Sequence, residues 1–236
     1  MQANGTARVG FSMLAALLLV GCGGTSSDSQ QTYILQKAMA GLVASGFTAN
    51  VTIAGSAMVN GTMTPFSGLG TFTATPAVTA TFNNGTALAQ TQTISGTITA
   101  AGQTQTYSSS LTTEHAPGPG GFLGEIVGGE YDVAQTSFAY PTMVTTTTLV
   151  LGTLSRYSDS TLSLSLGTIQ VSVKVVMAPV DPGSPEQVQF MFQIYDTAQS
   201  LVATATFNYN LTSTSVLSFA AAAAQNASGS LTVTVT

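Results

Sequence analysis

The sequence contains few charged residues and no tryptophan. Lys, Arg, Asp and Glu make up 6% of the 236 residues, and the formal net charge is −5, whereas charged residues are about 25% of an average protein. Only four residues are basic. Nucleic-acid binding needs clustered Lys and Arg to neutralise phosphates. The composition therefore excludes nucleic acid as a partner, and it excludes a polybasic membrane patch for the same reason.

Cysteine and histidine each occur once, as Cys22 and His115. One cysteine cannot build a disulfide framework, and these two residues cannot supply the usual ligands of zinc. A serine triad would have to use His115, with Glu114 or another carboxylate orienting it. No Gly-x-Ser-x-Gly motif occurs, and His115 lies in a glycine- and proline-rich stretch. We therefore expect no catalytic residues and no cofactor, and we expect His115 to be a solvated loop residue.

Carboxylates are the remaining candidates for a metal site. Glu125, Glu130 and Asp132 lie close together in a glycine-bearing stretch, and calcium prefers oxygen ligands. No EF-hand spacing is present. The sequence therefore predicts no metal site. These three residues are weak calcium candidates, and otherwise we expect them to be solvated charges in a loop. It also predicts that Asp159 and Asp196 cap turns between strands.

An apolar run lies near the N-terminus and leads to the single cysteine. Residues 9–20 read VGFSMLAALLLV, after a polar start whose only charge is Arg8. A run of this length is typical of a secretory signal and is shorter than the roughly 20 apolar residues of a membrane-spanning helix. The run ends as Leu19-Val20-Gly21-Cys22, which resembles the lipobox of a bacterial lipoprotein signal peptide.

This resemblance covers residues 1–22 and implies how the chain is processed. Residues 1–21 would be the signal peptide, and Cys22 would carry a diacylglyceryl group and often a further acyl chain after cleavage. Two or more acyl chains hold a protein stably on a membrane. Gly23 stands where retained inner-membrane lipoproteins have aspartate, so the resemblance implies an outer-membrane destination, facing the periplasm or the cell surface. Residues 22–31 would be a flexible polar tether.

From Phe47 onward, apolar and polar residues alternate with a period of two. Between residues 71 and 82 the even positions are mainly Phe, Ala and Val, and the odd positions are mainly Thr. Such alternation is typical of antiparallel strands with one buried and one solvated face. It recurs over residues 162–166, 169–177, 188–194, 201–211 and 231–235. Turn signals such as Asn60-Gly61 and Ala101-Gly102 separate the runs, and we count about ten to twelve strands.

One helix is expected before the strands, over residues 32–44, because apolar residues recur there at three- and four-residue spacing and Ser45-Gly46 follows. We therefore predict an all-β protein, an antiparallel meander that forms a sandwich or a barrel, with this short N-terminal helix. The run Ala220–Ala224 remains open, because its intrinsic propensity is helical and its position between strand patterns favours a strand.

The alternation breaks at residues 114–130, which contain six glycines and two prolines. This composition predicts irregular structure, either a linker or one long loop. The expected organisation is a β domain over residues 32–236, with a subdivision into 47–113 and 131–236 left open.

Several functional classes fit these features. The leading expectation is a lipid-anchored, non-enzymatic envelope protein with a binding or structural role, contacting an envelope protein or carbohydrate. The alternative is a carrier of a small apolar ligand inside a β-barrel or sandwich. A membrane-embedded barrel and an enzyme built on His115 are less favoured. The inward side chains of the carrier would include Phe72, Phe82, Phe190, Phe192, Phe207 and Tyr209.

Overall fold

The alternating segments form antiparallel strands, and one helix precedes them. The structure, a computed structural model, describes residues 33–118, 121–181 and 183–236. Cys22, the expected signal peptide and the expected tether lie outside these residues. The elements are α1 (Leu35–Ser45), β1 (Phe47–Val59), β2 (Thr62–Ala74), β3 (Val78–Phe82), β4 (Gly85–Ala100), β5 (Gln103–His115), β6 (Gly121–Val127), β7 (Glu130–Ala139), β8 (Leu149–Tyr157), β9 (Ser165–Met177), β10 (Glu186–Tyr195), β11 (Leu201–Leu211), β12 (Leu217–Asn226) and β13 (Gly229–Val235).

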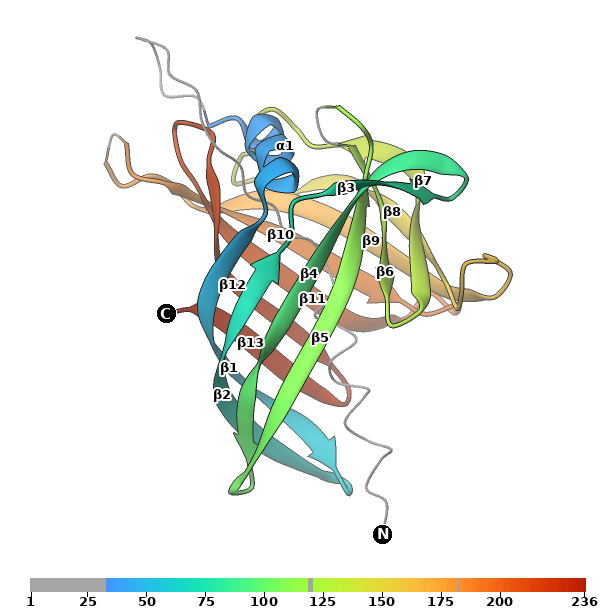
Figure 1. Cartoon of the computed structure of the whole chain (residues 1–236), viewed down its shortest axis with the longest axis vertical. Helices are drawn as coiled ribbons and strands as arrows, with labels where there is room; N and C mark the ends of the chain where they lie inside the picture. The colour runs from blue at the N-terminus through green and yellow to red at the C-terminus, as the bar shows by residue number, and fades with distance from the viewer. Residues whose placement is uncertain (1–32, 119–120, 182) are drawn as a thin grey trace.

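Twelve of these strands close into one antiparallel barrel (Figure 1). Strands β4 to β13 follow one another around the ring in chain order. Strand β13 then pairs with β1, β1 with β2, and β2 pairs back with β4. The predicted all-β fold class is confirmed, and the barrel is the form that it takes. Closure matters because a closed ring leaves none of its strands with an unpaired edge.

The seam between β2 and β4 is lined by glycines. Gly68 and Gly70 lie on β2, opposite Ile98 and Gly96 of β4. A Cβ added to Gly68 would collide with the carbonyl oxygen of Thr97, and one added to Gly96 with that of Leu69. Glycine within a strand often marks a bend or a close backbone approach. Here the missing side chains let the two backbones meet and the ring close.

Strand β3 stands outside the ring. The alternation over residues 71–82 predicted one strand, but Pro76 lies between β2 and β3 and has no N–H to donate to a ladder. Strand β2 pairs with residues 92–100 of β4, and β3 pairs with residues 85–89. After Pro76, the β3–β4 hairpin packs on the outer side of the barrel, where the rings of Phe82 and Tyr131 stack with centroids 6.4 Å apart.

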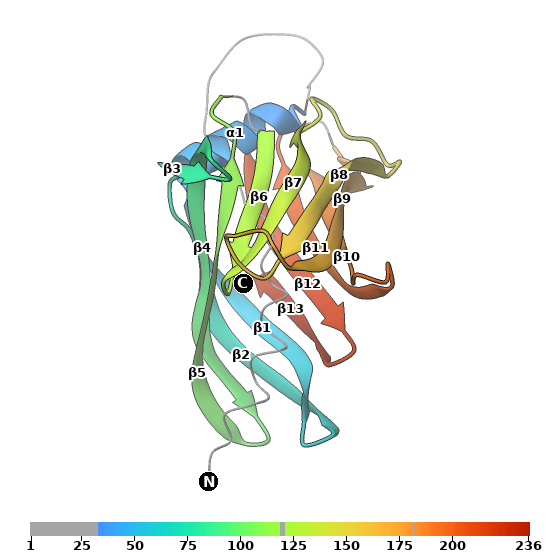
Figure 2. The ribbon, with the colours of Figure 1, turned by 90° about the vertical axis from the view of Figure 1, so that its right-hand side faces the viewer.

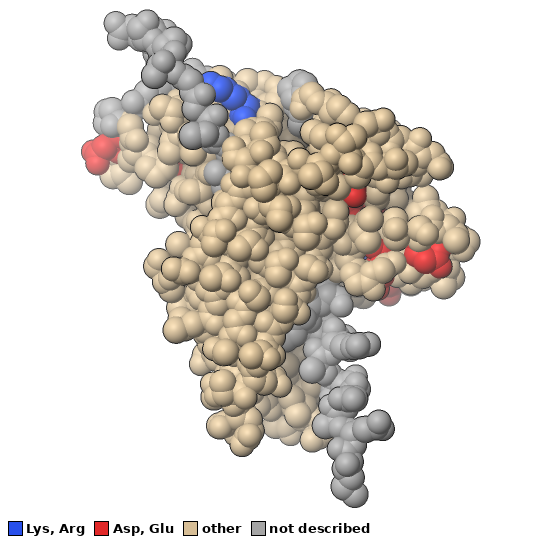
Figure 3. Space-filling view, viewed as in Figure 1, with Lys and Arg blue, Asp and Glu red and all other residues tan. Residues whose placement is uncertain are grey.

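Side chains alternate between the inside and the outside of the barrel. On β10, for example, Phe190 and Phe192 are buried, whereas Gln189, next to Phe190, lies outside and donates from Nε2 to Oδ1 of Asn208 at 3.0 Å. The outer face shown in Figure 3 carries few charged groups. The buried aromatic side chains of the central core are Phe66, Phe72, Phe122, Phe138, Tyr140, Phe190, Phe192, Phe207, Tyr209 and Phe219.

Helix α1 lies across one end of the barrel (Figure 2). The backbone N–H of Leu35 donates to the carbonyl of Thr142 at 3.0 Å, and the helix ends at Gly46, whose φ is 64°. The helix therefore begins slightly later than predicted. No helix among the described residues is long and apolar enough to cross a membrane. The side chains that α1 adds to the core are Leu35, Ala38, Met39, Leu42 and Val43.

Two local predictions were wrong, and one open question is decided. The stretch 114–130 is not irregular throughout, because β6 occupies Gly121–Val127. Its glycine content suggested a loop, but Gly124, with φ of 151°, lies within β6 and accommodates a register shift beside β5 and β7. Residues 162–164 form no strand, and β9 begins only at Ser165. The alanine run belongs to β12, where Ala222 faces the core. Strands from both 47–113 and 131–236 belong to the same barrel.

We predict that Gly68→Ala lowers the free energy of unfolding by about 2 kcal/mol, because the new Cβ overlaps backbone atoms of β4 that cannot rotate away. Gly85→Ala is the matched control on β4. The nearest atom to its Cβ would be the carbonyl oxygen of Phe82 at 3.6 Å, so we expect a change within about 0.5 kcal/mol. Urea unfolding of both variants measures the difference, and equal stabilities would contradict the role given to the seam.

Candidate functional site

A row of polar side chains runs around the inner wall across five neighbouring strands. Gln90 of β4 is opposite Thr113 of β5, Thr113 is opposite Glu125 of β6, Glu125 is opposite Asp132 of β7, and Asp132 is opposite Arg156 of β8. We call these five residues the polar belt. The first four are almost completely buried. The belt therefore gives five of the twelve barrel strands a polar layer inside a mainly apolar interior.

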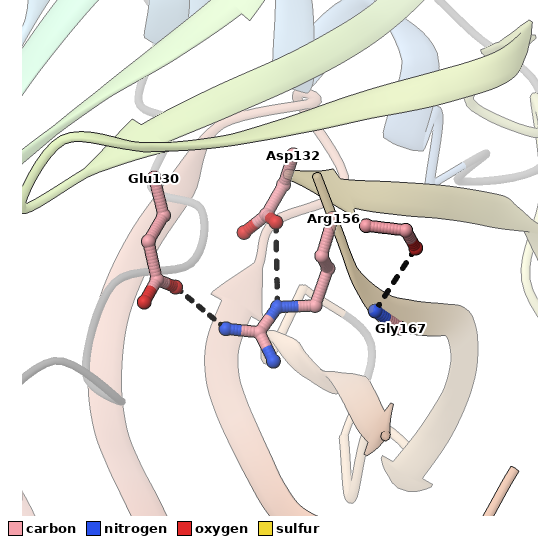
Figure 4. A network of polar contacts seen from close by, with 5 residues as sticks. Glu130, Asp132, Arg156 and Gly167 are labelled. Atoms are coloured by element: carbon pink, nitrogen blue, oxygen red, sulfur yellow. Dashed lines mark hydrogen bonds and ion pairs between the residues drawn. The ribbon is translucent and has the colours of Figure 1, made fainter. Parts of the chain in front are cut away.

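Arg156 is the only cation of the belt and is shared by two carboxylates (Figure 4). Its Nη2 donates to Oε2 of Glu130 at 2.7 Å, and its Nε lies 3.4 Å from Oδ1 of Asp132. The Asp132 side chain is 4% exposed, whereas that of Glu130 is 38% exposed. The guanidinium thus links the inner belt to the barrel surface, and it leaves Glu125 without a direct ion pair among the described residues.

Thr113 organises the hydrogen bonds at the other end of the belt. Its hydroxyl donates to the backbone carbonyl of Gln90 at 3.4 Å and accepts from Nε2 of Gln92 at 3.2 Å. Nε2 of His115 lies 3.1 Å from the same oxygen. Since the single hydroxyl proton is used on Gln90, the histidine must donate from Nε2. His115 is therefore the tautomer with its proton on Nε2, and its Nδ1 is an acceptor.

Three buried acceptor atoms around Thr113 have no hydrogen-bond partner in the described part of the chain. They are Oε1 of Gln90, Nδ1 of His115 and Oε2 of Glu125. The amide nitrogen of Gln90 is used, because it donates to the carbonyl of Leu42 at 3.1 Å near the end of α1. A buried acceptor left unpaired costs about 1–3 kcal/mol. At these atoms the described part of the protein leaves hydrogen-bond acceptors unused.

Burial sets the protonation of this wall. Desolvation lowers the pKa of His115 to about 3, so its imidazole is neutral. Desolvation raises the pKa of Asp132 to about 7 although Arg156 opposes it, and burial together with the charge of Asp132 raises the pKa of Glu125 well above its usual range. Burial, with a smaller contribution from Glu125, raises the pKa of Tyr140.

Glu114 lies on the opposite side of the wall from Thr113. Its β6 partner Gly124 lies under the ring of Phe82 from the β3–β4 hairpin. Glu114 is consequently 3% exposed although it points away from the barrel interior. Burial raises its pKa to about 7. The segment Thr113–His115 is therefore covered on both sides, by the core and by the hairpin.

The structure corrects the expectations for the charged residues and for the histidine. His115 is not a solvated loop residue, because it is 1% exposed at the end of β5. Glu125 and Asp132 are not solvated loop charges but cross-strand neighbours inside the barrel. Within the described ranges, no group of three or more His, Cys, Asp or Glu side chains is placed to hold a metal ion. Two of the calcium candidates, Glu130 and Asp132, contact Arg156 instead.

The two predicted turn residues are confirmed. Oδ1 of Asp159 accepts from the backbone N–H of Thr161 at 2.8 Å, and Oδ1 of Asp196 accepts from those of Ala198 and Ser200, both at 2.9 Å. Gln90, Thr113 and Arg156 were missed as site residues. They carry no local motif, and only the register of five strands brings them to one wall. Cys22, the predicted lipidation site, lies outside the described residues.

Comparisons with protein-family models, with curated proteins and with solved structures find no match. The function is therefore inferred from the barrel and its interior.

We predict that the protein loses stability as the pH rises from about 4 to about 7. Over this range Asp132 and Glu114 keep their protons in the folded chain, because their pKa values are about 7, whereas the unfolded chain releases them near 4. The unfolded state then binds fewer protons, so the free energy of unfolding falls with pH. His115 acts in the opposite sense, because only its unfolded form binds a proton below about 6.

Urea unfolding at several pH values measures this slope. Glu114→Gln removes one of the retained protons and should flatten the fall. His115→Asn removes the opposing contribution and should steepen it. A stability that rises over this range in the unaltered protein would contradict the raised pKa values.

We also predict that Arg156→Gln lowers the free energy of unfolding by about 2–3 kcal/mol at pH 7.5, because it leaves Asp132 and Glu130 without their shared cation. Lys174→Gln, which removes a cation from the outer face of β9, should change stability by no more than about 0.5 kcal/mol. Thermal or urea unfolding compares the two variants, and equal effects would show that the ion pairs contribute little.

Proposed function

We propose that the protein is a lipid-anchored, non-enzymatic carrier of the cell envelope that holds a small, mainly apolar molecule inside the barrel. The observation that carries this proposal is the set of buried acceptors on Gln90, His115 and Glu125, which the described chain leaves unpaired next to an apolar interior. Ligand sites are usually apolar surfaces with a few polar groups that fix orientation. The wall around Thr113 has this character.

The size of the barrel supports the same role. About eight strands already give an interior that side chains fill or that encloses one small ligand. Twelve strands surround a wider space, and part of this wall carries small residues such as Ala203, Ala205, Ala222 and Ala224. The aromatic side chains that were expected to line a ligand are in the central core, except Phe82, which packs in the outer cluster beside the hairpin.

The outer surface of the barrel supports the proposal that the protein faces water in the cell envelope. A membrane-spanning barrel turns apolar side chains outward and has a polar interior. In this barrel the outward positions of several strands carry hydroxyl and amide groups, as in the pairs Ser56–Ser230 and Gln187–Asn210, and the inward positions are mainly apolar. We propose attachment through lipidated Cys22 at the outer membrane, which rests on the lipobox resemblance.

The carrier proposal predicts a small molecule that is purified with the protein. The full chain would be produced in bacteria, extracted from membranes in mild detergent and weighed by native mass spectrometry beside a denatured control. We expect an extra mass that disappears on denaturation. Ala222→Leu should reduce the retained mass by narrowing the interior, and Ala223→Leu, on the exposed face of the same strand, should not. A bare protein mass in all samples would count against a carrier.

The proposed lipid anchor at Cys22 leads to a separate prediction. Cys22→Ala should move the protein from the membrane fraction to the soluble fraction, because a chain without acyl groups loses their membrane affinity. Fractionation and immunoblotting measure this shift, and intact mass spectrometry of the unaltered protein should show the added acyl mass. Retention of the Cys22→Ala variant in the outer-membrane fraction would exclude lipidation as the anchor.

A further inference from the structure

The three unpaired atoms on Gln90, His115 and Glu125 can all accept hydrogen bonds. Oε1 of Gln90 is an acceptor only, and Nδ1 of His115 is an acceptor because Nε2 is the donor to Thr113. Burial favours the protonated form of Glu125 in the protein alone, and a cation bound beside it would favour the ionised form, whose oxygens only accept. All three residues are at most 2% exposed. A ligand that satisfies this wall must therefore bring hydrogen-bond donors.

The three acceptors surround one position of the wall. Gln90 and Glu125 are the register partners of Thr113 on its two sides, and His115 contacts the Thr113 hydroxyl on the same face of β5. The hydroxyl of Tyr140 is also without a hydrogen-bond partner in the described chain, and Glu125 contributes to raising its pKa. The three residues that carry the acceptors therefore all adjoin Thr113, by cross-strand register or by direct contact.

The charge of the wall also favours a positive partner. Glu125, Glu130 and Asp132 are three carboxyl groups, and Arg156 is the one cation among the described residues that contacts any of them. Arg156 contacts Glu130 and Asp132. Glu125, once a bound cation favours its ionised form, therefore has no direct ion pair within the described part of the chain. The aromatic ring of Phe122 contacts the ring of His115, with centroids 5.6 Å apart, and aromatic faces attract cations.

We propose that the molecule carried in the barrel ends in a primary ammonium group, which binds at Thr113 between Gln90, His115 and Glu125. This inference rests on the proposed carrier function. A primary ammonium has three N–H donors, one for each unpaired acceptor, and a positive charge for Glu125. A hydroxyl group offers one donor and no charge. A carboxylate would meet acceptors and further negative charge. The rest of the molecule is apolar, as the interior requires.

The test measures binding of four probes with the same apolar chain to the full-length protein at pH 7.5, below their micellar concentrations. The probes are dodecylamine, dodecanol, dodecanoate and dodecyltrimethylammonium. We expect dodecylamine to bind at least about tenfold more tightly than each of the others, because a charged hydrogen bond to a buried partner is worth about one power of ten. The trimethylated probe keeps the charge and has no N–H donor, so it separates the two contributions.

Two variants test whether the ammonium group binds at Glu125. Glu125→Gln should remove most of the preference for dodecylamine over dodecanol and leave dodecanol binding within about threefold. Glu186→Gln is the matched control, since Glu186 is a buried carboxyl on β10, away from the belt. It should leave the preference unchanged. Circular dichroism reports whether each variant is folded, and the four-probe comparison on the unaltered protein decides the proposal even where a variant does not fold.

The outcomes separate this inference from the carrier function. Binding of dodecanol or dodecanoate as tight as that of dodecylamine would overturn the ammonium site and leave the carrier in place. Equal binding of dodecyltrimethylammonium would overturn the match between donors and acceptors. Binding of none of the four probes would overturn both proposals. A preference for dodecylamine that Glu125→Gln abolishes and Glu186→Gln retains would establish the site.

Discussion

Pairing of β2 with β4 is the constraint on which the rest of the structure depends. Without this seam the twelve strands would form an open sheet, and their apolar faces would have no common interior. The seam forms because Gly68, Gly70 and Gly96 allow two backbones to approach where any side chain would collide with a carbonyl oxygen. The absence of Cβ atoms at the seam thus permits the ring closure that gives the apolar faces of the strands a common interior.

The polar belt is costly for such an interior. Buried carboxyl groups and unpaired acceptors oppose folding, and the ion pairs of Arg156 offset only part of this cost. Proteins commonly retain locally unfavourable groups where function needs them. The belt is confined to β4–β8, whereas β9–β13 supply mainly apolar inward side chains. This one-sided arrangement suits a ligand with one polar end and one apolar end.

The β3–β4 hairpin explains why the sequence was hardest to interpret at the belt. A strand with one solvated face alternates between apolar and polar residues, but β5 and β6 are covered on the inside by the core and on the outside by the hairpin. Thr113, Glu114 and His115 are therefore buried in succession. Together with the glycines and prolines that follow it, such a segment has the composition of a loop, although most of it is strand.

The sequence by itself determined the all-β class, the short helix, most strands after Ile169 and the turns at Asp159 and Asp196, because alternation and turn chemistry are properties of neighbouring residues. Only the tertiary structure decided between barrel and sandwich, and only it brought Gln90, Thr113, Glu125, Asp132 and Arg156 to one wall. These relations depend on the register between strands and on ring closure. Both arise from pairings between segments far apart in the chain, which no local pattern records.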